Sequence, residues 1–378
     1  MQADELAAAL DAMGLAVRTF DYRKNVQQVS AALADPNCCF FVCFSGFGSE
    51  LLLTSGAAGY LIAAFEHFKK PLFDLMIECP AHEEMRHQIE STGGMRHLLL
   101  TDPCNAYAAR LLGVESVRTV RGIVFPKTIG ASIKPWSERS VGILLPIDTG
   151  DAEQVRRRHE TADTYKSRTF REIFEGVAEY ALSDLRVDPM VQTLIACQDI
   201  GIPADFRNRD LRFLLSSVID YVGAARNQCL IEAIEHLPVT VVGSATPLAG
   251  QMPTALRFID APTPRELLAA VTDAKVVVCP FASHSGARLR AMAAFTAGAA
   301  VMAAPDEILE TAFVHGKHML TYRSFEELAR FLEQAIHRDQ EVESLAIDGQ
   351  ARALDQFSPH ILASTMLSIA RVQFPPEL

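Results

Sequence analysis

The sequence lacks the features that would place the protein in a membrane, outside the cell or on nucleic acid. No apolar run approaches the roughly 18–20 residues that a bilayer-spanning helix needs. The chain opens with Met-Gln-Ala-Asp-Glu, without the Lys- or Arg-led start of a signal peptide. A net charge of −11 argues against nucleic acid as the main partner, because phosphate backbones are bound by clustered Lys and Arg. These absences predict a soluble protein of the cytoplasm.

Motifs for metal and redox chemistry are also missing. None of the eight cysteines shows C-x-x-C spacing, and no Asp-x-Asp pair occurs among the expected loops. The cysteines lie mostly in apolar runs, as Cys38, Cys39, Cys43 and Cys279 do, which predicts reduced and buried thiols. The basic run Arg156–His159 is short and lies in acidic surroundings, so we interpret it as a solvated helix face. A contact with an anionic acceptor or a lipid is the alternative.

What is present is core material for two domains of ordinary size, with 49% hydrophobic residues in a chain of 378. In residues 1–125, near-continuous apolar strands alternate with amphipathic helices, which is typical of a parallel sheet covered on both faces. The expected helices are Asp4–Met13, Asn25–Ala34, Gly56–Phe68, His82–Ser91 and Asn105–Leu112; the expected strands are Ala16–Phe20, Cys38–Phe44, Pro71–Ile77, His97–Thr101 and Ser116–Val120. Because a Rossmann-like domain normally begins with a strand, an opening strand is either missing from the chain or supplied elsewhere in it.

The second half begins after a change of composition in residues 126–140, which we interpret as a linker rich in turn residues. Residues 141–345 are expected to form the second α/β domain, with a helical block between its first two strands. The expected strands are Val141–Ile147, Val239–Val242, Leu256–Ile259, Lys275–Pro280 and Ala299–Ala304, with helical segments at Asp151–Cys197, Leu211–Glu235 and Pro264–Thr272. Residues 346–378 are expected to form the last helices.

The stretch Val276–Tyr322 carries the strongest functional signal. It reads as strand, loop, helix ending at Gly298, strand and a helix start at Pro305. In parallel sheets, ligands bind beyond the carboxyl ends of strands, where helix N-termini offer N–H groups to anions. The loop Ala282–Ala287 is therefore a candidate phosphate site. Its candidate residues are His284, Ser285, Arg288 and Arg290; the two arginines are two positions apart and point to different faces, so we expect only one to reach the ligand.

The residues around this loop resemble a known family. Arg290 and Gly298 fit the helix frame Arg-x-x-Glu-Ala-x-Ala-x-Gly of GT-B glycosyltransferases, closest to the CgeB-like (spore-maturation) group. The following segment fits the family pattern at Phe313, Gly316, Lys317, Tyr322 and Phe325-Glu326-Glu327-Leu328. The two acidic positions of the family motif are occupied here by Ser285 and Ala293.

The resemblance implies a GT-B-like fold, in which two Rossmann-like domains face a cleft and the last helices cross back to the first domain. It also implies transfer of a sugar from a nucleotide-diphosphate donor to an unidentified acceptor, with no cofactor besides that donor and no obligatory metal. The donor would bind mainly to the second domain and the acceptor to the first. Two alternatives remain open: a non-catalytic relative that binds sugar nucleotides or serves as a scaffold, favoured by Ser285 and Ala293, and an epimerase or hydrolase of the same fold.

Three further positions are candidates for donor binding. Gly46 and Gly48 follow an apolar strand and would let the backbone approach a sugar or diphosphate; a tight turn is the alternative. Gly243 and Ser244 end another strand at the expected nucleotide edge, where an ordinary loop is equally consistent. Glu310 would replace the missing acid in binding ribose hydroxyls, whereas helix N-terminal stabilisation explains Glu307.

A candidate general base lies in the first domain. Glu78 and His82 flank Pro80 after a strand, so that an imidazole beside a carboxylate would accept a proton from an acceptor hydroxyl. The alternative is that His82 caps the next helix while Glu78 pairs locally. A metal site with His87 is discounted, because the i, i+5 spacing puts the two imidazoles on different helix faces. Asp102 is more consistent with a helix cap than with a ligand-binding residue.

Overall fold

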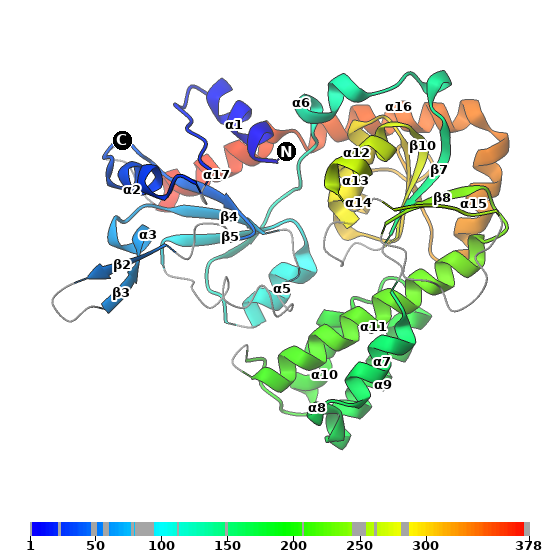
Figure 1. The fold of residues 1–378 in the computed structure, drawn as a ribbon, viewed down its shortest axis with the longest axis horizontal. Coiled ribbons are helices and arrows are strands. Elements are labelled where there is room, and N and C mark those ends of the chain that lie inside the picture. Colours follow the sequence, from blue (N-terminus) through cyan, green and yellow to red (C-terminus); the bar gives the residue numbers. More distant parts are fainter. Residues whose placement is uncertain are drawn as a thin grey trace. The chain divides into compact units, whose positions relative to one another are not determined.

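The computed structural model describes residues 2–21, 24–46, 51–55, 60–76, 79, 94–111, 113–147, 150–205, 208–243, 255–260, 263–280 and 287–373. The chain divides into two compact units (Figure 1). Unit 1 comprises Met1–Arg121, Asp205–Arg207 and Pro359–Leu378, and unit 2 comprises Gly122–Ala204 and Asn208–Ser358. Among the described residues, no helix combines the length and the apolar character needed to cross a membrane.

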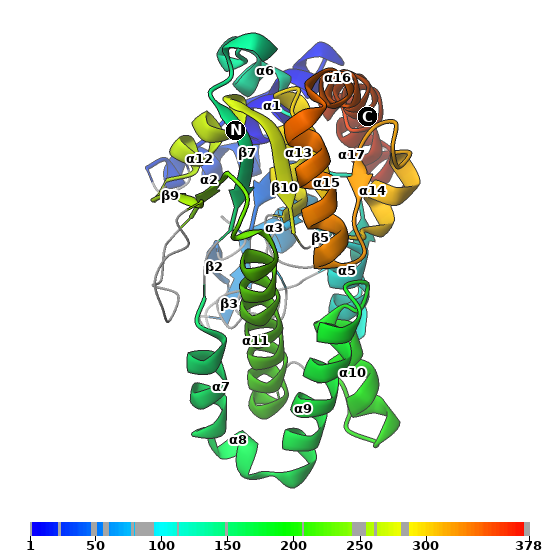
Figure 2. The ribbon, with the colours of Figure 1, turned by 90° about the vertical axis from the view of Figure 1, so that its right-hand side faces the viewer.

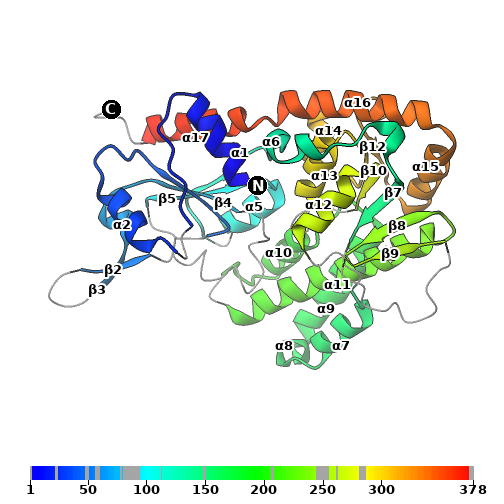
Figure 3. The same cartoon turned by 45° about the horizontal axis from the view of Figure 1, so that its top comes forward.

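Unit 1 is built on a four-stranded parallel sheet in the order β1-β4-β5-β6. Every residue of β4 and β5 is buried, because both strands are central and both of their faces are covered. Helices α1 and α17, from opposite ends of the chain, pack side by side (Figure 3). The described elements are α1 (Gln2–Ala12), α2 (Val26–Ala34), β1 (Phe41–Phe44), β2 (Leu52–Ser55), β3 (Tyr60–Ala63), α3 (Ala64–His67), β4 (Leu72–Met76), β5 (Arg96–Leu100), α5 (Pro103–Leu111), β6 (Val117–Thr119) and α17 (Pro359–Gln373).

Two expectations for unit 1 were wrong. The segment predicted as helix Gly56–Phe68 contains β3 and the short α3, and β3 pairs antiparallel with β2. Gly56 and Gly59 disfavour a helix, and the run Tyr-Leu-Ile that follows suits a strand. The segment predicted as strand Ala16–Phe20 pairs with no strand in the described part of the chain; together with β1 it lines a cavity of about 520 Å³.

Unit 2 contains a six-stranded parallel sheet in the order β12-β11-β10-β7-β8-β9. Helices α11, α15 and α16 cover one face through a shared apolar core, and α12 and α13 pack on the other (Figure 2). This arrangement and the parallel sheet of unit 1 confirm the α/β fold class. The sheet and its covering helices are β7 (Val141–Pro146), β8 (Val239–Val242), β9 (Arg257–Ile259), α12 (Pro264–Thr272), β10 (Ala274–Cys279), α13 (Ala287–Thr296), β11 (Ala300–Ala303), α14 (Glu307–Ala312), β12 (Leu320–Thr321), α15 (Phe325–His337) and α16 (Asp339–Gln356).

The expected helical block lies between β7 and β8 and packs around the 26-residue helix α11 (Figures 1 and 2). Arg226 of α11 is 1% exposed and donates hydrogen bonds to the carbonyls of Ala181, Asp184 and Val187 at the end of α9. This guanidinium therefore joins the last turn of α9 to the connection that leads to α10. The helices are α7 (Ala152–Glu160), α8 (Asp163–Lys166), α9 (Arg168–Ser183), α10 (Pro189–Asp199) and α11 (Arg209–Ile234).

Residues 126–140, expected as a linker, are folded into unit 2 as α6 (Pro126–Ile129) and two short 3₁₀ turns. Arg139 anchors the segment by donating hydrogen bonds to the carbonyls of Ala274, Ala297 and Gly298 at 2.7–2.9 Å. Its guanidinium also lies 5.3 Å from the ring centroid of Trp136. The proline and glycine content that predicted a linker instead shapes turns held by a partly buried arginine.

The cysteine prediction holds for part of the set. All eight cysteines lie in the described residues and none forms a disulfide; Cys43, Cys79, Cys197 and Cys279 are buried, but Cys39 and Cys229 are exposed. Cys229 lies on α11, whose helical period carries it away from the core even though its neighbours Leu230 and Ile231 are buried.

Gly349 provides a first test of this packing. A methyl group there would overlap the carbonyl oxygen of His318 and lie 3.1 Å from Cε1 of Phe295. We expect Gly349→Ala to lower the free energy of unfolding by about 1–3 kcal/mol through overpacking. Gly176, on the exposed side of α9, has no atom within 4 Å of the added methyl. Gly176→Ala should therefore raise stability by about 0.5–1 kcal/mol, and chemical denaturation of both variants measures the contrast. Equal effects would contradict the packing of α16.

His159 provides a second test. Its ring is 0% exposed and stacks 4.0 Å from Phe174, with Phe213 and Tyr165 around it. Within the described residues neither ring nitrogen has a hydrogen-bond partner, and burial lowers the pKa of His159 to about 4, opposed weakly by Glu175. The arginines of the same basic run form ion pairs with Glu160, Glu153 and Asp220 at the surface. The three arginines of the run therefore lie on a solvated helix face, whereas its histidine is part of the core.

Because the unfolded state takes up a proton near pH 6.5 and the folded state only near pH 4, stability is lost as the pH falls through this window. We expect the wild type to lose roughly 2 kcal/mol of unfolding free energy between pH 7.5 and pH 5 relative to His159→Phe. Urea denaturation at both pH values provides the measurement. Parallel pH profiles for the two proteins would show that His159 is accessible to protons in the folded state.

Candidate functional site

The carboxyl edge of the unit 2 sheet is the place where the chain reverses its strand order. From β7, the chain adds β8 and β9 on one side, and it then adds β10, β11 and β12 on the other. The reversal therefore lies between β7 and β10. In open parallel sheets such a switch point leaves a crevice outside the strand ends, where ligands bind. The pairs Pro146–Val242 and Cys279–Ala303 mark this edge, and the pairing of Leu144 with Val277 puts them at one level.

Arg290 lies at this switch point. It projects from the first turn of α13, and its Nη1 donates a hydrogen bond of 2.9 Å to the carbonyl oxygen of Pro146, the last residue of β7. Its charge also acts on Cys279, the last residue of β10. Burial raises the pKa of the Cys279 thiol to about 12, and Arg290 opposes that rise. The half-buried guanidinium thus lies beside the ends of both strands.

Arg288 has a different role in the same turn. Its side chain is 7% exposed, and its Nε donates a hydrogen bond of 2.9 Å to Oδ2 of Asp306. The other carboxylate oxygen of Asp306 accepts from the N–H of Leu309 and so caps α14. This pair joins the helix that follows β10 to the helix that follows β11. The two arginines therefore point to different places, with Arg290 at the strand edge and Arg288 in a buried ion pair.

Other candidates of unit 2 lie along the same edge or outside the described residues. Gly243 directly follows β8, and its N–H donates to the carbonyl of Ile259 at 3.3 Å. Glu310 is exposed in the first turn of α14. The candidates Ser244, His284 and Ser285 lie outside the described residues.

In unit 1 the glycine turn is held from within. The N–H of Gly46 donates to Oδ1 of Asp74 at 2.9 Å, and the fully buried Asp74 also forms an ion pair with Arg96. Ser45 and Gly46 both have positive φ, 52° and 77°, so a buried carboxylate stabilises a left-handed turn. This N–H is directed at a side chain of the protein, which corresponds to the tight-turn alternative at Gly46. Gly48, Glu78 and His82 lie outside the described residues.

Asp102 caps α5, since its Oδ1 accepts from the N–H groups of Cys104 at 2.7 Å and Asn105 at 3.3 Å. This is the helix-cap alternative expected from the sequence. Among the described residues, no group of three His, Cys, Asp or Glu side chains is arranged to hold a metal ion.

Sequence reasoning missed the partners of the site arginines. Pro305-Asp306-Glu307 predicted a helix start, but no local signal links Asp306 to an arginine 18 positions earlier. It also gave no role to Tyr322, which is 0% exposed and whose hydroxyl has no hydrogen-bond partner in the described part of the chain. Burial and then Cys279 raise the pKa of Tyr322, against the charge of Arg226. Tyr322 directly follows β12, and its N–H donates to the carbonyl of Ala303, the last residue of β11, at 3.1 Å.

Comparison with known protein families found a match over part of the chain. The family model described as "Glycosyl transferase-like" matches residues 226–368, which include Gly243, Arg290 and Glu310. No curated protein matches the chain.

Three of the solved structures that resemble this chain are described here by their sequence identity, TM-score and coverage. HepE from Anabaena, in complex with UDP-glucose, is 12% identical with a TM-score of 0.46 and aligns over 81% of this chain and 74% of its own. Sucrose-phosphate synthase from Thermosynechococcus elongatus is 13% identical, with a TM-score of 0.43 and coverage of 81% and 68%. A glycosyltransferase from Rickettsia africae is 8% identical, with a TM-score of 0.43 and coverage of 99% and 94%. The family model makes residues 226–368 glycosyl transferase-like, and the finer CgeB-like grouping stays a prediction.

Proposed function

We propose that the protein transfers a sugar from a nucleotide-diphosphate donor to an acceptor, and that the diphosphate binds at the carboxyl edge between β7 and β10. One observation carries the proposal: Arg290 lies at the topological switch point of a sheet whose sequence is glycosyl transferase-like. A switch point supplies the crevice, and a guanidinium there supplies charge-assisted hydrogen bonds to phosphate oxygens.

The electrostatics of this edge suit a leaving diphosphate. The positive end of the α13 dipole and Arg290 both favour the negative charge that develops as the sugar–phosphate bond breaks. Two groups whose negative charge would repel an anion are neutral or paired. Burial raises the pKa of Cys279 to about 12, so the thiol stays neutral, and the Asp306 carboxylate is paired with Arg288. The edge therefore offers cationic donors without a competing negative charge from these two residues.

The acceptor side of the proposal rests on the sequence. His82 would take the proton from an acceptor hydroxyl while Glu78 raises its basicity, and Glu310 would bind the donor ribose. Transfer without a metal ion, inferred from the missing Asp-x-Asp pair, is part of the same proposal.

A non-catalytic sugar-nucleotide-binding protein is the second candidate function. It is favoured by Ala293, which occupies the motif position of a glutamate and is 8% exposed within α13. A carboxylate missing from this helix removes one ligand group, and neither the charge of Arg290 nor the dipole of α13 replaces it.

Replacing Arg290 tests the donor site. We expect Arg290→Ala to weaken nucleotide-diphosphate binding by roughly 1.5–3 kcal/mol, because a charge-assisted contact is lost, with little effect on the melting temperature. Isothermal titration with UDP, GDP and ADP, followed by thermal melts, measures both quantities.

Arg288→Ala is the matched control from the same helix turn. It should lower the free energy of unfolding by about 3–5 kcal/mol, because it leaves the buried Asp306 carboxylate without its cation. Undiminished nucleotide affinity in Arg290→Ala would remove the diphosphate from this edge.

Turnover separates the two candidate functions. Incubated with a panel of nucleotide-sugars and cell extract as acceptor source, an enzyme should release free nucleotide diphosphate, and the release should persist in EDTA if no metal is needed. Arg290→Ala should slow the release roughly 10–100-fold. Donor-dependent thermal stabilisation without any release would favour the non-catalytic function. In that case Ala293→Glu should tighten donor binding only if the ribose lies against α13.

A further inference from the structure

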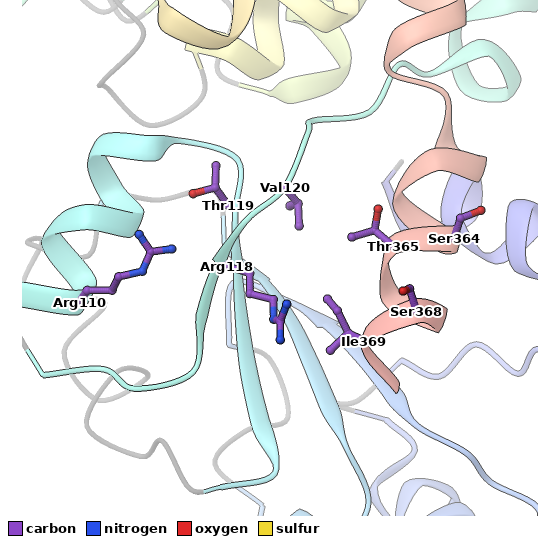
Figure 4. A pocket seen from close by; sticks show the side chains of 8 residues that line it. All are labelled: Arg110, Arg118, Thr119, Val120, Ser364, Thr365, Ser368 and Ile369. Atoms are coloured by element: carbon purple, nitrogen blue, oxygen red, sulfur yellow. The ribbon is translucent and has the colours of Figure 1, made fainter. Parts of the chain in front are cut away.

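A pocket of about 670 Å³ lies in unit 1, between the end of β6 and helix α17. This volume falls within the range of about 300–1,000 Å³ that is typical of small-molecule sites. Figure 4 shows its lining residues, which are arginines and hydroxyl-bearing side chains in the main: Arg110, Arg118, Thr119, Ser364, Thr365 and Ser368. The pocket belongs to a different unit from the proposed donor edge, and its argument does not rest on sugar transfer.

The charge of the pocket is unusual for this protein. The chain has a net charge of −11, yet the described residues that line the pocket include two arginines and no carboxylate. Arg118 forms no hydrogen bond or ion pair within the described ranges, and its charge lowers the pKa of His97 after the larger effect of burial. Arg110 uses one N–H for the carbonyl of Val117 at 3.3 Å. Arg110 and Arg118 are exposed, as are Arg157 and Arg168, but the latter two are each paired with a glutamate on the same helix.

Hydroxyl groups face this charge from the other wall. Thr365 and Ser368 lie on one stripe of α17 at spacing i, i+3, and Figure 4 shows both on the side of the helix toward β6, with Ile369 between Ser368 and Arg118. The Thr365 hydroxyl donates to the carbonyl of Ile361 at 2.8 Å, which leaves its oxygen as an acceptor. Ser364 and Ser368 have no hydrogen-bond partner among the described residues, so their O–H groups remain as donors.

We propose that this pocket binds a small molecule through a phosphate group. A tetrahedral phosphate presents oxygen acceptors in several directions at once, which suits a guanidinium on the strand side and a hydroxyl donor on the helix side. Arg118 is the principal contact, Ser368 contributes a hydrogen bond, and Arg110 adds charge from α5. A ligand that bridges β6 and α17 binds only the folded unit, so it also stabilises the packing of α17.

The test uses the full-length protein and two sources of the same chemistry. Glycerol 3-phosphate, followed by isothermal titration and thermal shift, represents a free phosphate ester; vesicles containing phosphatidylglycerol, followed by co-sedimentation, represent a lipid headgroup. We expect saturable binding of at least one probe, an affinity at least about tenfold lower in Arg118→Gln, and a partial rescue in Arg118→Lys. Ser368→Ala should lower the affinity a few-fold.

Arg168→Gln is the matched control, because it removes the same charge from an exposed side chain of unit 2. It should leave probe binding unchanged, which separates a local contact from the net charge of the protein. Binding of glycerol 3-phosphate alone identifies a free phosphate ester, and vesicle binding lost in Arg118→Gln identifies a lipid headgroup. The proposal is overturned if neither probe binds saturably, if Arg118→Gln and wild type bind equally, or if Arg290→Ala rather than Arg118→Gln abolishes binding.

Discussion

The buried ion pair between Arg288 and Asp306 holds the arrangement on which the carboxyl edge of unit 2 depends. It connects the helices that follow two neighbouring strands, and it is anchored on one side by the helix cap that Asp306 provides for Leu309. With Arg288 turned inward, the helical period places Arg290 two positions later on another face, where its guanidinium reaches Pro146. This ion pair thus fixes the starts of α13 and α14, and it neutralises the Asp306 carboxylate near the carboxyl edge of the sheet. The same pair explains why two arginines so close in sequence have such different surroundings.

Buried or partly buried guanidinium groups connect neighbouring elements at several places in this protein. Arg226 collects three carbonyls at the end of α9, and Arg139 collects carbonyls at the end of α13 and at the start of β10. In unit 1, Arg96 joins Asp74, which in turn stabilises the left-handed turn at Gly46. Each connection supplies hydrogen-bond partners for groups that a helix end or a turn leaves unpaired, where an orphan would be costly. The protein therefore combines an acidic surface with a cationic internal framework, and the pocket that Arg118 lines differs from both.

The sequence predicted the elements well where the interactions that form them lie between residues close together in the chain. Helix α12 begins and ends where expected, because Thr263 and Glu266 form a capping box and Pro264 opens the helix, and α13 ends before Gly298, whose φ of 66° suits a helix C-terminus. The failures occur where strand pairing decides the outcome. Part of the expected helix Gly56–Phe68 is β3, which pairs with β2, whereas the residues at Ala16–Phe20 carry strand-like side chains without a strand to pair with among the described residues.

By itself, the sequence determined the α/β class, the parallel strands of both units and the carboxyl edge to which the helix bearing Arg288 and Arg290 leads. Hydrophobic periodicity, helix caps and glycine turns depend on residues close together in the chain, so they favour the same local structure in any tertiary context. Only the tertiary structure decided which arginine faces that edge. Arg288 and Asp306 are 18 positions apart, and Arg290 and Pro146 are 144 positions apart, so no local pattern encodes either contact. The same holds for the pocket of unit 1, since β6 and α17 become neighbours only when the end of the chain packs against its beginning.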